Sequence, residues 1–88
     1  MKKKEIDLSY LNELMDSVMQ DTSVPRNIRK VVEEAKTKIQ GKEELGVKIS
    51  SAIYMMDDIS NDINMPSHTR TEIWTIISEL ENVKEKIK

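Results

Sequence analysis

The segment DDISNDIN at positions 57–64 carries a dense group of oxygen-donating side chains. Within it Asp58, Asn61 and Asp62 stand at i, i+3 and i+4, so on a helix they share one face where a divalent cation could bind. The segment lacks the glycine and the regularly spaced ligands of a calcium-binding loop. We therefore interpret it as a solvated helix face followed by a helix-starting residue, and we predict no metal ligand.

Two aspartate–arginine pairs recur with the same spacing, Asp21 with Arg29 and Asp62 with Arg70. Each acid stands near the end of one predicted helix, and each arginine lies on the next helix. A carboxylate near a helix C-terminus is unfavourable unless a cation is close. We predict a structural clasp across each hairpin, made by a salt bridge or by a contact with main-chain carbonyl groups. The alternative is a pair of anion-binding arginines.

His68 is the only histidine, and the sequence contains no cysteine. A lone histidine cannot be both a general base and a set of metal ligands, and no serine stands in a recognisable nucleophile elbow. The lack of cysteine also excludes disulfides and thiolate zinc sites. We therefore predict a protein that is not an enzyme, with no catalytic residue and no cofactor. A metal-dependent enzyme stays as an alternative.

The composition is typical of an all-α protein, because Leu, Ile, Met, Glu and Lys dominate and glycine occurs only twice. No segment has the length of a membrane span, and the basic first residues are not followed by the apolar region of a signal peptide. We expect a cytoplasmic location without a membrane partner. The net charge of −2 gives no strong basic field for phosphate backbones.

The sequence repeats itself with an offset of 41 residues. DTSVPRNIR at 21–29 corresponds to DINMPSHTR at 62–70, and the apolar pattern on either side also matches. A period of this size is typical of helical repeats. We infer two tandem helical hairpins, at about 5–40 and about 43–87, in a single domain that spans residues 1–88.

Apolar residues recur at helical spacing in four segments. The pattern predicts helices at about 5–20, 24–40, 43–60 and 65–87. The most regular stripe belongs to the fourth helix and consists of Ile73, Ile76, Ile77, Leu80, Val83 and Ile87.

Helix-start signals explain the repeated loop motif. Ser23 and Asn64 can each accept a hydrogen bond from a free N–H group of the helix that follows. Pro25 and Pro66 are expected in the first helical turn, where the missing N–H group costs nothing.

Two hairpins can pack as a closed antiparallel four-helix bundle or stack like two units of a HEAT-like array. A two-unit stack leaves both ends uncovered, and stable arrays usually need three or more units. We predict the bundle and keep the two-unit stack as the alternative.

The segments DTSVPRNIRKVVEEA (21–35), LGVKISSAIYMMDDISNDINMPSHTR (45–70) and TIISELE (75–81) resemble an uncharacterised family of short archaeal proteins, UPF0147. The resemblance covers nearly the whole chain apart from its two ends. It implies a compact all-helical archaeal protein with no assigned activity. It transfers no catalytic residue.

Three aromatic residues, Trp74, Tyr54 and Tyr10, fall off the apolar stripes of their helices. Because tryptophan is enriched at binding hot spots, one interpretation is that these residues form an interface. The alternative is that Trp74 packs at the edge of the bundle, against the first helix or the loop. The leading hypothesis is a small protein-interaction module that binds another protein or a second copy of itself.

A ribosome- or RNA-associated factor is the alternative hypothesis. The second predicted helix is basic, with Arg26, Arg29, Lys30, Lys36 and Lys38 against Glu33 and Glu34. The acids are interleaved with the basic residues, and aromatic positions for base stacking are missing, which argues against this alternative.

Overall fold

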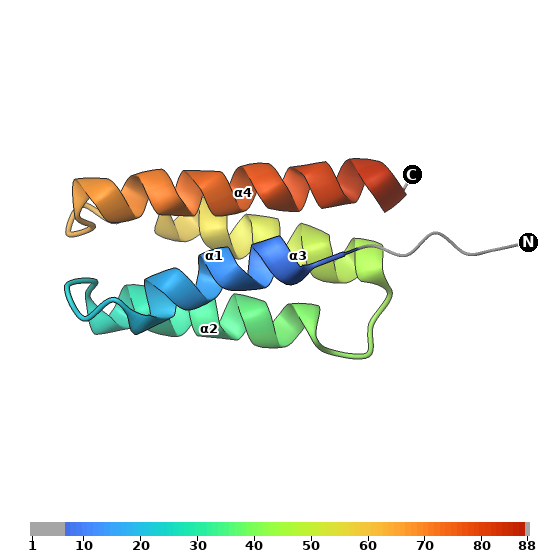
Figure 1. The fold of residues 1–88 in the computed structure, drawn as a ribbon, viewed down its shortest axis with the longest axis horizontal. Helices are drawn as coiled ribbons and strands as arrows, with labels where there is room; N and C mark the ends of the chain where they lie inside the picture. The colour runs from blue at the N-terminus through green and yellow to red at the C-terminus, as the bar shows by residue number, and fades with distance from the viewer. Residues whose placement is uncertain (1–6, 88) are drawn as a thin grey trace, which may run out of the picture.

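The computed structural model describes residues 7–87, and this part of the chain consists of four α-helices with no β-strand (Figure 1). The all-α prediction is confirmed. Each helix begins two to four residues later than the sequence pattern suggests, and residues 5 and 6 of the first predicted helix lie outside the described range. The helices are α1 (Ser9–Gln20), α2 (Arg26–Ile39), α3 (Leu45–Ile59) and α4 (Ser67–Ile87).

The helices form an antiparallel bundle in which each helix contacts the next one in the chain, and α4 closes against α1. The diagonal pairs α1 with α3 and α2 with α4 are not adjacent. A HEAT-like stack would instead place α1 on α3 and α2 on α4, so that alternative is wrong. The loop between α1 and α2 and the loop between α3 and α4 lie at the same end, here called the hairpin-loop end (Figure 1).

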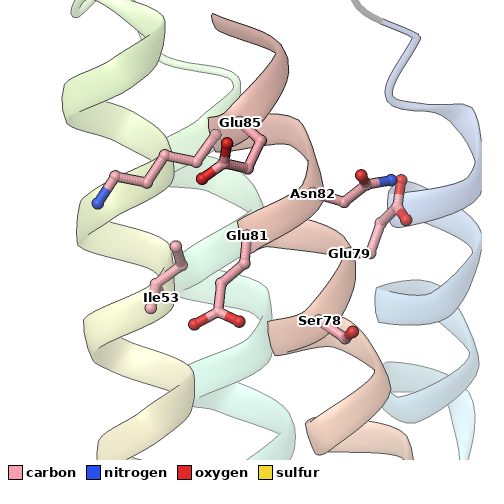
Figure 2. A pocket seen from close by; sticks show the side chains of 7 residues that line it. Ile53, Ser78, Glu79, Glu81, Asn82 and Glu85 are labelled. Atoms are coloured by element: carbon pink, nitrogen blue, oxygen red, sulfur yellow. The ribbon is translucent and has the colours of Figure 1, made fainter. Parts of the chain in front are cut away.

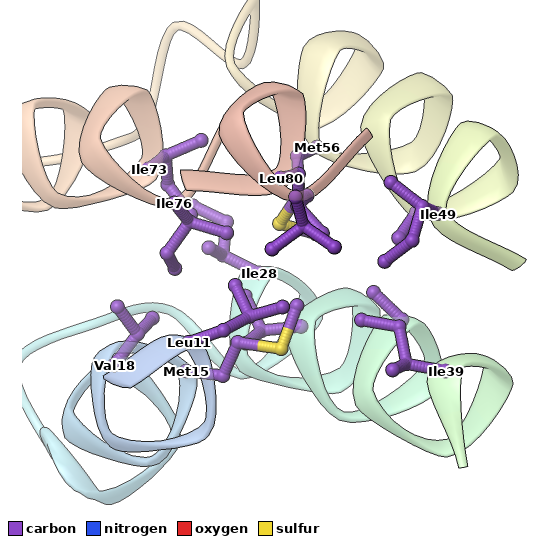
Figure 3. Close-up of a cluster of buried hydrophobic side chains, with 14 of the residues drawn as sticks. Leu11, Met15, Val18, Ile28, Ile39, Ile49, Met56, Ile73, Ile76 and Leu80 are labelled. Carbon is purple, nitrogen blue, oxygen red and sulfur yellow. The ribbon is translucent and has the colours of Figure 1, made fainter. Parts of the chain in front are cut away.

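A single apolar core fills the space between the helices, and its side chains point inward from all four (Figure 3). Burial follows the 41-residue offset, which is compatible with a duplicated hairpin. The buried pairs on the second helix of each hairpin are Ile28 and Thr69, Val32 and Ile73, Ala35 and Ile76, and Ile39 and Leu80.

Thr69 is the exception in this core. It is fully buried, and it is the only buried polar residue found among residues 7–87. Its counterpart in the first hairpin is the apolar Ile28. Thr69 directly follows His68, so the exception lies beside the only histidine of the chain.

An aspartate organises each hairpin loop. Asp21 Oδ1 accepts hydrogen bonds from the Ser23 N–H (2.9 Å) and the Ser23 hydroxyl (2.6 Å). In the second loop Asp62 Oδ1 accepts a hydrogen bond from the Asn64 N–H (2.8 Å). In each loop the carboxylate therefore accepts a hydrogen bond from the N–H group two residues later, as in an Asx-turn.

The prediction that Ser23 caps α2 is wrong, because the Ser23 hydroxyl donates to Asp21 and no side chain caps this helix. The hydrogen bond from this hydroxyl to the ionised Asp21 carboxylate is charge-assisted. It is therefore stronger than a bond between the hydroxyl and an uncharged N–H group of the helix. Asn64 likewise takes part through its N–H group, as a donor to Asp62. Pro25 is the last residue before α2 rather than a residue of its first turn, and Pro66 directly precedes α4.

No helix within residues 7–87 is long and apolar enough to cross a membrane.

Replacing Leu80 tests how far stability depends on the core. Leu80 is fully buried, so Leu80→Ala removes buried methyl groups and leaves a cavity. We expect the free energy of unfolding to fall by about 2–5 kcal/mol. Glu81→Ala, at the next and exposed position, should change it by less than about 0.5 kcal/mol. Guanidinium denaturation followed by circular dichroism measures both, and an equal effect of the two changes would contradict the core assignment.

Candidate functional site

Polar side chains link the two hairpins at the hairpin-loop end. Asp21 Oδ2 lies 3.2 Å from His68 Nε2, at the start of α4. In the other direction, the Asn27 side-chain amide donates to Asp62 Oδ2 over 3.1 Å, at the start of α2. Asn27 and His68 are 41 residues apart, as are the two aspartates. Each loop aspartate thus uses one oxygen for its own loop and the other for the opposite hairpin.

The two arginines of the predicted clasp contact main-chain carbonyl groups of their own loops. Arg29 Nε donates to the Val24 carbonyl (3.0 Å), and Arg70 Nη2 donates to the Asp62 carbonyl (2.7 Å). The ion pairs found within residues 7–87 do not join either arginine to an aspartate. The structure therefore places these arginines in the carbonyl-contact form of the two that we considered.

The acidic segment 57–64 does not gather its carboxylates around one point. Asp57 and Asp58 are exposed near the end of α3, whereas Asp62 faces Asn27. The Ser60 hydroxyl and the Asn61 side-chain amide both donate to the Asp57 carbonyl. The three acids of this segment thus do not form a cluster of metal-ligand geometry in the described part of the chain.

A different cluster brings together residues that are distant in sequence. Asp21 in the first loop meets His68 and Glu72, which stand one turn apart on α4. One potential ligand atom from each lies within 4.8 Å of the other two. The Ser17 hydroxyl donates to Glu72 Oε2 over 3.5 Å, while Glu72 Oε1 is shielded from solvent and accepts no hydrogen bond within the described residues.

Sequence reasoning missed this cluster because α2 and α3 separate Asp21 from His68 and Glu72 along the chain. A local signal exists in the His-x-x-x-Glu spacing at 68 and 72, which places both side chains on one helix face. The third member, Asp21, is brought close only by the packing of α4 against α1.

The Asp21 carboxyl is held in its ionised form. The hydrogen bond from the Ser23 hydroxyl, the hydrogen bond from the Ser23 N–H group and the contact with His68 lower the pKa of Asp21 below its ordinary value of 3.8. Hydrogen bonds to a carboxylate favour its charged form. A negative charge therefore persists at this point of the hairpin-loop end at neutral pH.

Large apolar side chains are exposed near the same end of the molecule. Ile63 at the tip of the second loop is 91% exposed, and Trp74 on α4 is 57% exposed. Together with Ser60, Asn61 and Arg70 they line an open hollow of about 460 Å³. Ile63 and Trp74 are here called the Ile63–Trp74 patch.

The other two predicted interface residues are also exposed, but on other helices. Tyr54 on α3 is 76% exposed and Tyr10 on α1 is 53% exposed. Neither lines the hollow of the Ile63–Trp74 patch. Sequence reasoning missed Ile63, although an apolar residue at a loop tip whose repeat counterpart is the polar Thr22 is a usable signal.

A larger hollow of about 690 Å³ surrounds the C-terminal half of α4 (Figure 2). Glu81 points toward Ile53 of α3, whereas Glu79 and Asn82 point to the opposite flank of α4 (Figure 2). The hollow therefore passes around the helix and does not collect its carboxylates at one point.

The structure is that of a small all-α protein, a closed bundle of two helical hairpins with polar contacts and an apolar patch at one end. Residues 1–83 match the sequence model of Uncharacterised protein family (UPF0147). The chain belongs to this family, and the resemblance inferred from the sequence is confirmed.

Curated relatives from archaea and two solved structures agree with this assignment. A UPF0147 protein of Methanocaldococcus jannaschii is 52% identical over 73 residues, which are 81% of this chain and 77% of the relative. A crystal structure of the unknown function protein MMP1188 has a TM-score of 0.81 at 43% identity, covering 90% of this chain and 96% of that one. A crystal structure of a UPF0147 protein from Thermoplasma acidophilum has a TM-score of 0.82 at 39% identity, covering 86% and 91%.

Replacing Asp62 tests the contacts of its carboxylate with its own loop and with the opposite hairpin. Asp62→Ala removes the acceptor of the Asn64 N–H group and of the Asn27 amide. We expect a loss of about 1–2 kcal/mol and a fall of the melting temperature by at least about 4 °C. Asp58→Ala, at an exposed position in the same segment, is the matched control and should leave the melting temperature within about 2 °C. An unchanged melting temperature for Asp62→Ala would show that these carboxylate contacts do not stabilise the fold.

The lowered pKa of Asp21 predicts a dependence of stability on pH. A depressed carboxyl pKa adds stability that is fully present above the ordinary value of 3.8 and is lost as the pH falls through the lowered pKa. Asp21→Asn keeps an acceptor for Ser23 but cannot ionise. We expect the wild type to melt at the higher temperature at about pH 6, and the difference to shrink toward about pH 2. Thermal melts across this range measure it; a difference that does not vary with pH contradicts the assignment.

Proposed function

We propose that this protein is a small, non-enzymatic protein-interaction module and that the Ile63–Trp74 patch is its binding surface. The observation that carries the proposal is the exposure of two large apolar side chains that line one hollow. Their burial by a partner would favour binding by about 1.5–3 kcal/mol for each side chain.

Arg70 adds a polar contact to the same surface. It lines the hollow, and one of its guanidinium nitrogens, Nη2, is held by the Asp62 carbonyl. Its Nε atom is shielded from solvent and has no hydrogen-bond partner within the described residues. Tryptophan and arginine are the residue types most enriched at binding hot spots. The surface therefore suits a partner that inserts an apolar side chain beside the Arg70 guanidinium.

The small extent of the patch favours a different protein over a second copy of this chain. Obligate homodimers bury roughly 2,000 Å² or more in largely apolar interfaces. Two exposed side chains supply far less than this, because Tyr54 and Tyr10 lie outside the hollow. A transient complex with another protein matches a patch of this size.

The basic face of α2 supports nucleic-acid binding less well. Lys36 is paired with Asp16, Lys38 with Glu43, and the Arg29 side chain binds the Val24 carbonyl. Only part of the positive charge of this helix is therefore available for phosphate groups. Binding to RNA or to a ribosome remains an outcome that the experiment below distinguishes.

Substitution of Trp74 tests the proposal. The tagged full-length protein is incubated with lysate of the source cell, with and without nuclease, and a captured protein is then purified and its affinity measured. We expect Trp74→Ala and Ile63→Ser each to weaken this affinity by about 30-fold or more, as expected of hot-spot residues. Tyr10→Ala, which removes an aromatic residue of similar exposure on α1, is the matched control.

Three outcomes contradict the proposal. If Tyr10→Ala weakens binding as much as Trp74→Ala, the Ile63–Trp74 patch is not the binding surface. Loss of the captured material on nuclease treatment assigns binding to nucleic acid instead. Sedimentation of the purified protein as a dimer that Trp74→Ala dissociates assigns the patch to a second copy of this chain.

A further inference from the structure

One imidazole nitrogen at the hairpin-loop end is surrounded by oxygen atoms. His68 Nε2 lies 3.2 Å from Asp21 Oδ2, and 3.4 Å from both Ser23 Oγ and Thr69 Oγ1. A ligand atom of Glu72 completes a triad with those of Asp21 and His68 within 4.8 Å. We infer that Asp21, His68 and Glu72 bind one divalent transition-metal ion of the zinc type.

The spacing of the three ligand atoms suits such an ion. Zinc binds histidine nitrogen and carboxylate oxygen at about 2.0–2.2 Å, so two ligands of a tetrahedral site lie about 3.4 Å apart. The 3.2 Å separation of His68 Nε2 and Asp21 Oδ2 is already close to this value. Glu72 stands one turn after His68 on the same face of α4, and its ligand atom lies within 4.8 Å of those of His68 and Asp21.

Glu72 carries an unsatisfied acceptor at this point. Its Oε1 atom is shielded from solvent and accepts no hydrogen bond from the described residues, and its Oε2 atom receives only a long one from Ser17. A shielded polar atom without a partner costs free energy. A cation bound between Glu72 and His68 would satisfy it.

The first hairpin shows which side chain is sufficient to bind the opposite loop aspartate without a metal ion. At the positions of His68 and Glu72 it has Asn27 and Val31, 41 residues earlier. The single hydrogen bond from the Asn27 amide is enough to hold Asp62. In the second hairpin an imidazole replaces the amide, a carboxylate replaces valine, and Thr69 replaces the buried Ile28. These three changes add polar groups at one point, more than the contact with the loop aspartate requires.

The donor set selects the class of ion. Calcium and magnesium prefer sites built from oxygen ligands, whereas an imidazole suits zinc and its neighbours in the first transition row. Three protein ligands from one imidazole and two carboxylates leave positions for water, since His68 is exposed. The site shares no residue with the Ile63–Trp74 patch, and the inference does not depend on the proposed function.

Zinc titration of the full chain tests this inference. The protein is first treated with a chelator and dialysed, and zinc chloride is then added in a calorimeter while the His68 imidazole signals are followed by NMR. We expect one ion per chain, a shift of those signals and a rise in the melting temperature. His68→Asn and Glu72→Val should each weaken binding by about 100-fold or more, since loss of a residue that merely supports a ligand costs 10–100-fold.

These two substitutions introduce the residues that the first hairpin carries at the same positions, so we expect the bundle to stay folded, which circular dichroism checks. Asp58→Asn, in the acidic segment at the end of α3, is the matched control and should bind zinc as the wild type does. The inference is overturned if no heat and no imidazole shift are seen at millimolar zinc. Binding that survives Glu72→Val but not His68→Asn reflects a single surface histidine and also overturns it, as does equal weakening by Asp58→Asn.

Discussion

Burial of one apolar core determines where everything else in this molecule lies. The chain has no cysteine, so no disulfide can contribute, and a domain of this size is held mainly by the surface that it buries. Each helix must turn its stripe inward, from Leu11 and Met15 on α1 to Ile76 and Leu80 on α4. The remaining positions on each helix are consequently fixed as outward-facing, and the outward flanks of α4 carry both the His68 cluster and Trp74.

The loop aspartates convert this packing into a defined joint at one end. Asp21 and Asp62 each bind their own loop with one oxygen and the opposite hairpin with the other. A carboxylate has two oxygen atoms and can reach both partners at once, whereas a serine hydroxyl at the same place has only one oxygen atom. The two hairpins repeat this arrangement with few differences. The first hairpin therefore serves as a reference for the second, which differs from it around His68 and Glu72.

Helical period and composition were sufficient to predict the four helices, their apolar stripes and the closed bundle. The reason is physical: the stripe on each of these helices recurs at 3.6 residues, and most of its residues are buried or half-buried. The ends of the helices were harder, because the choice between Ser23 and Asp21 as the organising loop residue depends on competition among nearby acceptors. The Asp21, His68 and Glu72 cluster was not accessible at all, since 47 residues separate Asp21 from His68 and only tertiary packing joins them.

The start of α4 concentrates the chemistry for electrostatic reasons as well as geometric ones. The unpaired N–H groups of a helix N-terminus carry a partial positive charge, which favours the ionised carboxylate of Asp21 nearby. Trp74 follows six residues later and therefore lies about 120° around the helix from His68. The two features thus share a helix but neither a flank nor a side chain, and a change in either can be made without removing the other.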